Sequence, residues 1–213
     1  MKRTWVILCC LLFLGCLFWC CPLFHVVRID QFNNSLDESA FKAADFAKTF
    51  WSERLTPSLK QAPDAATLLA DLRANSEAAR AKFGRKVGVS RTRLIVLRGT
   101  GTIVTIDKKG VGIALHSDTK EADVVLQTGL LFGNTVRDAT GLLNASNYPD
   151  SRQFNEISTE LNRIIEASVV PILKEKAIVG RQIHFAGCTE IADEGELVKP
   201  LKIIPLDVRV DQR

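Results

Sequence analysis

Residues 94–116 read LIVLRGTGTIVTIDKKGVGIALH, and their pattern indicates the fold class. Short runs rich in β-branched residues are separated by glycines and by the polar turn at 107–110, which is typical of a β-hairpin. Tightly curled strands need glycine at bulges and corners, and Gly99, Gly101 and Gly112 meet that need. The stretch therefore predicts the first strands of a strongly curved antiparallel sheet.

The sequence after this stretch predicts further strands and one long helix. The expected elements are a strand at 122–126, a short extended piece at 134–137, a helix over about 150–177, and strands beginning at 183 and at 206. Pro171 is expected to kink or shorten the helix, and Pro205 to stand at the start of the last strand. This order is that of a small OB-like β-barrel, although an open α+β sheet would give nearly the same pattern. We therefore predict an α+β fold with an OB-like β-barrel domain (β-β-β-α-β-β) at 91–213.

The sequence before the strands has a helical period. Apolar residues recur from Phe46 to Leu59 at helical spacing, with Pro57 near the end of the stripe. A second helix is expected to open at Pro63-Asp64 and to end at Gly84. Residues 36–84 are therefore expected to form a helical hairpin, connected to the N-terminal segment by a tether at 25–35.

Residues 1–24 have the pattern of an export signal or a membrane anchor. Lys2 and Arg3 precede an uncharged apolar run that extends to Phe24 and is long enough to span a bilayer. Two outcomes stay open: cleavage followed by lipid modification of Cys16, or retention of the whole segment as a single-pass anchor. Both place the rest of the chain on the extracytoplasmic (periplasmic) side of the cell envelope, attached to the membrane.

Cysteine placement and charge exclude several classes of protein. Five of the six cysteines lie in the first 21 residues and only Cys188 lies beyond, which argues against a disulfide scaffold and a zinc site. Without Lys2 and Arg3 the chain carries 26 basic and 24 acidic residues, a net charge of +2. With few aromatic residues on the expected strands, this balance argues against nucleic acid as a partner.

No established catalytic, phosphate-binding or metal-binding motif occurs, so we expect a non-enzymatic protein without cofactor or metal. The expected contact residues for a small polar ligand are Arg137, Asp138 and Asn147. An arginine fork binds carboxylates or sugar hydroxyls well, and neighbours on a strand point to opposite faces, so no ion pair is expected between Arg137 and Asp138. The alternative is that this pair caps the following loop and helix.

Two other functions remain open. One is an extracytoplasmic hydrolase that uses Asp138 with His116 or His184, which requires the carboxylate and an imidazole within hydrogen-bond reach. The other is a structural envelope adaptor without a pocket.

Five segments together resemble a known bacterial family. They are ATLLADL at 66–72, GTGTIVTID at 99–107, VRDA at 136–139, ELN at 160–162 and VGRQIHFAG at 179–187. The chain resembles an uncharacterised family of predicted periplasmic lipoproteins, whose genes often lie beside sugar ABC-transporter genes. The resemblance implies membrane attachment and, as candidate partners, ABC-transporter components. It implies no particular activity.

Overall fold

The computed structural model describes residues 43–116, 119–148 and 151–211. The chain divides into the units Met1–Ser39 and Ala40–Arg213, and all described residues belong to the second. The predicted anchor segment 1–24 with Cys16, and the tether at 25–35, lie outside the described residues. In the part that is described, none of the helices combines the length and apolar character needed to cross a bilayer.

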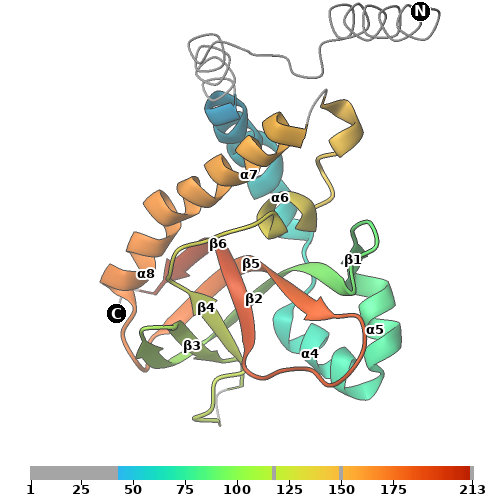
Figure 1. Cartoon of the computed structure of the whole chain (residues 1–213). Helices are drawn as coiled ribbons and strands as arrows, with labels where there is room; N and C mark the ends of the chain where they lie inside the picture. The colour runs from blue at the N-terminus through green and yellow to red at the C-terminus, as the bar shows by residue number, and fades with distance from the viewer. Residues whose placement is uncertain (1–42, 117–118, 149–150, 212–213) are drawn as a thin grey trace, which may run out of the picture. The chain divides into compact units, whose positions relative to one another are not determined.

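The centre of the fold is a six-stranded, strongly bent sheet (Figure 1). Its strands are β1 (Arg85–Lys86), β2 (Thr92–Asp107), β3 (Gly110–Ala114), β4 (Val124–Gln127), β5 (Gln182–Ala192) and β6 (Leu201–Val210). The pairings run β1–β2–β3–β4–β6–β5, and β5 pairs in turn with β2; only β4–β6 is parallel. Apart from the two-residue β1, this is the predicted order of three strands, a helical region and two strands.

The expected runs at 94–97 and 102–106 belong to one strand, β2, with Gly99 and Gly101 inside it. The first part of β2 pairs with β5 and its end pairs with β3, so the strand has to bend between two partners. A side chain at Gly101 would collide with the carbonyl oxygen of Ala114. The glycines therefore permit close approach and bending within one strand, as expected for a tightly curled strand.

Pro205 lies within β6, so the expectation that it starts the last strand was wrong. The strand begins four residues earlier, at Leu201, and Pro205 pairs with Gly187 beside a shift of register. Proline has no N–H group for the ladder, and a bulge is one of the places where a sheet tolerates it.

Helices precede the sheet. Residues 43–50 are helical and continue through a π-helical turn (Trp51–Leu55), α3 (Thr56–Ser58) and a 3₁₀ turn (Leu59–Gln61). The second expected helix is two, α4 (Ala65–Ala74) and α5 (Ser76–Phe83), because Asn75 leaves helical geometry and its side chain accepts from the Ala78 N–H. The first of these helices opens at the predicted place, and Asp64 caps its start by accepting from the Thr67 N–H.

The helical region between β4 and β5 contains α6 (Thr135–Ala139), α7 (Ser151–Ile164), a π-helical turn (Ile165–Val169) and α8 (Val170–Lys176). The extended piece expected at 134–137 was therefore wrong, because Thr135 to Ala139 form a helical turn. Helical geometry continues across Pro171 to Lys176, and the irregularity that precedes Pro171 is a π-helical turn. The preceding π-helical turn widens the helix, since the Val170 N–H bonds to the Ile165 carbonyl, five residues back.

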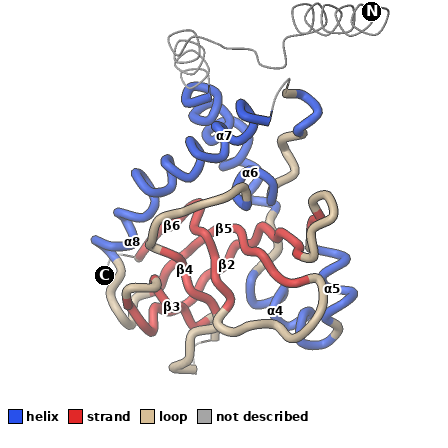
Figure 2. The backbone as a smooth tube through the Cα atoms, viewed as in Figure 1, coloured by secondary structure: helices blue, strands red, loops and turns tan. Residues whose placement is uncertain are grey.

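Helices and sheet share one hydrophobic core. Figure 2 shows α7 and α8 across one part of the sheet, and α4 and α5 beside another. Leu55 and Leu68 from the first helices, Leu97 and Ile113 from the sheet, and Leu161 from α7 are all completely buried in this core. The functional features must therefore lie where loops and helix faces leave the surface hollowed.

Candidate functional site

Arg137 is held inside the molecule, between α6 and α7, with 5% of its surface exposed. Its Nε and Nη2 bond to the two carboxylate oxygens of Asp138 at 2.7 and 3.0 Å. Its Nη1 donates to the Phe154 carbonyl (3.0 Å) and to Asn155 Oδ1 (3.1 Å), and the guanidinium lies 3.6 Å from the centroid of the Phe154 ring. Arg137 therefore fastens α6 to the first turn of α7.

The ion pair contradicts the expectation that Arg137 and Asp138 would point apart. That expectation assumed a strand; in a helix successive side chains are about 100° apart, and a long arginine can fold back onto its neighbour. Because each guanidinium nitrogen of Arg137 has an internal acceptor, the fork is already occupied by the protein. Arg137 can influence a ligand only through the groups it holds.

Beside this ion pair, a hollow of about 360 Å³ lies between residues 130–134 and one face of α7. We call it the Asn-rich notch. Its uncharged polar lining residues are Asn134, Asn155, Ser158, Thr159 and Asn162. Its remaining lining includes two exposed apolar side chains, Leu130 and Phe132, and two charged ones, Arg163 and Glu166.

The segment that forms one wall of the notch is tied to α7 and to the turn after it at two points. The Leu131 N–H donates to Glu166 Oε1 at 2.7 Å, and Asn162 Nδ2 donates to the Gly133 carbonyl at 3.1 Å. Gly133 has φ 84°, in the left-handed region that favours glycine, so the chain can turn there toward α6. Figure 1 shows this connection after β4 running along the long helix to α6. The wall is therefore set by specific contacts.

Ser158 has an unsatisfied hydroxyl at the floor of the notch. The residue is 3% exposed, and its Oγ has no hydrogen-bond partner. Thr159 and Ser168 donate their hydroxyls to the carbonyl four residues back. The corresponding carbonyl for Ser158 is that of Phe154, which already accepts a bond from Arg137 Nη1. A buried polar group without a partner costs about 1–3 kcal/mol, so a ligand that bonds to Ser158 would recover free energy.

Asn147, the third expected contact residue, does not line the notch. It is exposed at the end of a 3₁₀ turn (Ala145–Asn147), and its N–H donates to the Asn144 carbonyl. The next residue, Tyr148, packs against the ring of Phe154. None of the three expected contact residues lines the notch, although Arg137 bonds to Asn155, which does.

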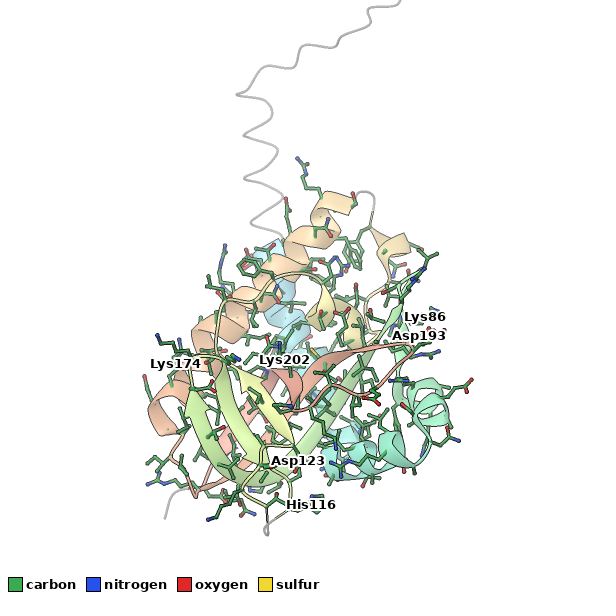
Figure 3. All side chains as sticks on the ribbon, turned by 60° about the horizontal axis from the view of Figure 1, so that its bottom comes forward. Lys86, His116, Asp123, Lys174, Asp193 and Lys202 are labelled. Atoms are coloured by element: carbon green, nitrogen blue, oxygen red, sulfur yellow. The ribbon has the colours of Figure 1, made fainter. Side chains whose placement is uncertain are left out.

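The two described strand-end histidines pair with carboxylates other than Asp138. His116 Nδ1 lies 3.9 Å from Asp123 Oδ2, and these residues lie together in Figure 3. His184 Nδ1 lies 2.8 Å from Thr100 Oγ1, and its Nε2 lies 3.4 Å from Asp211 Oδ1. Both oxygens of Asp138 bond to Arg137 instead. Within the described residues, no group of three or more His, Cys, Asp or Glu side chains could hold a metal ion.

The notch residues were missed by the sequence reasoning, although the sequence carries a signal for them. Asn155, Ser158 and Asn162 follow the spacing i, i+3, i+7, which puts them on one face of α7. Ser158 and Asn162 are buried, so polar side chains interrupt a face that is otherwise packed into the core. Such a row of buried polar residues on an amphipathic helix requires hydrogen-bond partners.

Comparisons with known proteins bear on the fold and the location. The family model described as "Predicted periplasmic lipoprotein (DUF2291)" matches residues 6–209. A crystal structure of an OB-fold protein from Thermotoga maritima superimposes with a TM-score of 0.70 at 28% sequence identity. The match covers 79% of this chain and 98% of that one, which confirms the predicted OB-like fold. A comparison with curated proteins found no significant match.

Proposed function

The chain belongs to the family of predicted periplasmic lipoproteins, and from this premise we propose that it is a membrane-tethered protein that binds a small polar ligand in the Asn-rich notch. The family confirms the predicted resemblance and agrees with the predicted extracytoplasmic, membrane-anchored location. In this function the fold supplies a rigid support, and the segment at 130–134 with α7 supplies the binding surface.

The observation that carries the proposal is the unpartnered Ser158 hydroxyl at the floor of a hollow of ligand size. Small-molecule sites are concave, of about 300–1,000 Å³, and contain a few well-placed polar groups; the notch has about 360 Å³. Its lining supports binding without catalysis. The only carboxylate in it, Glu166, accepts from the Leu131 N–H, and no base is hydrogen-bonded to Ser158.

The test compares Ser158→Ala with Ser168→Ala in the full-length protein extracted from membranes. Small-molecule mixtures would be screened by ligand-induced shifts of Tm and by native mass spectrometry. We expect Ser158→Ala to fold at least as stably as wild type, because it removes an unsatisfied buried hydroxyl, and to lose the ligand response. Ser168 is a matched control, since its exposed hydroxyl is bonded to the Ile164 carbonyl. Equal ligand responses in both variants would exclude the notch as the site.

We further propose that the protein also has a protein partner, and that this partner is a component of a sugar ABC transporter. The support is the family resemblance alone. Photo-crosslinking from an amino acid introduced in place of Phe132, whose side chain is 78% exposed at the rim of the notch, would test it. A crosslink to a transporter subunit or its substrate-binding protein is the expected result. Val89 is fully exposed and is the control position for the same introduced amino acid. If position 89 gave the same crosslinked products as position 132, the result would contradict the proposal.

One observation favours a second function, a hydrolase. Thr100, His184 and Asp211 form a chain of a hydroxyl, an imidazole and a carboxylate, and the first two line a separate hollow of about 280 Å³. An imidazole held by a carboxylate can take the proton of a hydroxyl that attacks an ester carbonyl. Hydrolysis of p-nitrophenyl acetate that disappears in His184→Gln and in Thr100→Val would support this function. Wild-type rates no higher than those of His184→Gln would rule it out.

A further inference from the structure

We infer that the Asn-rich notch is specific for an uncharged ligand that carries neighbouring hydroxyl groups and one apolar face. This inference rests on the proposed function, and it names the ligand class of the same site. It follows from the hydrogen-bonding state of Asn155, Ser158 and Asn162 on α7, from the contacts of the two charged residues in the lining, and from the two exposed apolar side chains Leu130 and Phe132.

Two side-chain amides along α7 are oriented by hydrogen bonds to the protein, and a hydroxyl without a partner lies between them in the sequence of the helix. Asn155 Oδ1 accepts from Arg137, which leaves its Nδ2 as a donor for the notch. Asn162 Nδ2 donates to the Gly133 carbonyl, which leaves its Oδ1 as an acceptor. Between them, the Ser158 hydroxyl has no partner and can donate and accept.

The resulting row is a donor, a hydroxyl and an acceptor on one helix face. Each hydroxyl of a polyol both donates and accepts, so two or more neighbouring hydroxyls satisfy such a row with no group left unpaired. A carboxylate only accepts and an ammonium only donates, so each would leave at least one group of the row without its complement.

The charged residues of the lining offer little to a charged ligand. Glu166 accepts from the Leu131 N–H at 2.7 Å, and Arg163 Nη1 bonds to Glu160 Oε1 at 2.7 Å. The Arg163 side chain is 67% exposed, and ion pairs at such exposure contribute little. A charged ligand would therefore lose its hydration without gaining a desolvated partner of opposite charge.

The apolar face of the ligand is indicated by Leu130 and Phe132, which are 75% and 78% exposed beside the polar row. Leu131 between them is buried, so the backbone holds both neighbours outward. An aromatic face that stands free next to hydrogen-bonding groups can cover the C–H surface of a ring-shaped polyol.

The experiment measures binding of two sets of probes to the full-length protein by isothermal titration calorimetry. One set consists of uncharged polyols: glucose, ribose and myo-inositol. The other consists of glucuronate and glucosamine, which keep the glucose skeleton and add a carboxylate or an ammonium group. We expect at least one uncharged probe to bind, and its charged counterparts to bind at least about tenfold more weakly.

Variants test whether the polar row on α7 and the exposed apolar side chains both contribute to binding of the uncharged probe. Ser158→Ala and Phe132→Ala should each weaken binding of the uncharged probe by about tenfold, whereas Ser168→Ala, which lies outside the lining of the notch, should leave it unchanged. Phe132 is largely exposed, so Phe132→Ala is expected to fold normally. It therefore still tests the inference if Ser158→Ala perturbs the fold. If a charged probe bound more tightly than every uncharged probe, and Ser158→Ala weakened that binding, the inference would be overturned. The proposed function would then still stand. Failure of every probe would overturn the inference, and the proposed function would fail with it only if the wider screen also gave no Ser158-dependent ligand.

Discussion

At the scale of single residues, Arg137 combines an ion pair, a cation–π contact and two hydrogen bonds in one buried side chain. Arg137→Ala leaves the Asp138 carboxylate, 15% exposed, without its partner, so we expect a loss of about 3 kcal/mol or more in the free energy of unfolding. Arg137→Lys should recover only part of this loss, because an ammonium cannot reproduce the fork. Urea denaturation measures the difference. Arg209→Ala, at an exposed position of β6, should change stability by less than about 0.5 kcal/mol and is the control. An Arg137→Ala variant as stable as Arg209→Ala would contradict this account of α6.

Cys188 carries a potentially reactive thiol that burial makes unreactive. Its side chain is fully buried in β5, and burial raises the pKa of the thiol to about 12. Because only the thiolate reacts readily, we expect negligible alkylation of Cys188 by iodoacetamide in the native protein at mildly alkaline pH, and complete alkylation in denaturant. Peptide mass spectrometry separates this thiol from the N-terminal ones. Rapid native labelling at Cys188 would show that β5 opens locally.

At the scale of elements, Asp193 joins β1 and β2 to the end of β5. Its carboxylate lies 2.9 Å from Lys86 Nζ and 2.5 Å from Arg93 Nε, and Figure 3 shows Lys86 and Asp193 together. Hydrogen bonds from Arg93, and then from Lys86, hold the pKa of Asp193 below its usual value. A lowered folded-state pKa means that the tie contributes stability above the unfolded-state pKa of about 3.9, and loses it as pH falls through the folded-state value.

The corresponding variant is Asp193→Asn. We expect it to be less stable than wild type at neutral pH, and the difference to shrink as the pH is lowered below about 4, since the wild type then also loses the charge. Urea midpoints measured at several pH values test this. Asp207→Asn, on an exposed position of β6, serves as the matched control. A difference between Asp193→Asn and wild type that stays constant down to acidic pH would show that the ion pairs are not its source.

The elements that the sequence predicted well are those fixed by local chemistry. The turn at 107–110 is one: Asp107 Oδ1 accepts from the N–H groups of Lys109 and Gly110, and all three partners are neighbours in sequence. The bend of β2 and the position of Pro205 depend on partner strands that are remote in sequence. The surroundings of Ser158 also depend on a residue remote in sequence, because the Phe154 carbonyl, four residues before Ser158, accepts from Arg137, which lies 21 residues before Ser158.

At the scale of the whole molecule, the first helices share the core of the sheet. Leu55 and Leu59 are buried in the same hydrophobic cluster as Leu97 of β2, and Trp51 packs against it. The cluster also contains Leu161 and Leu173 from the long helix, so the helices before the sheet and the helices between β4 and β5 depend on one core. The division into a helical hairpin at 36–84 and a domain at 91–213 stays a prediction that rests on the sequence pattern. Physically, the described residues are expected to unfold together.

That expectation gives a test of the whole fold. In a full-length variant with Trp5 and Trp19 changed to Phe, Trp51 is the sole tryptophan and reports on the first helix, while far-UV circular dichroism reports on all secondary structure. We expect the two signals to give one coincident urea transition. Leu55→Ala, which removes a completely buried side chain, should shift both signals equally by about 2–5 kcal/mol, because the cavity weakens the shared core. If Leu55→Ala moved only the Trp51 transition, the helices would be a separate folding unit, and the notch would rest on the sheet and α7 alone.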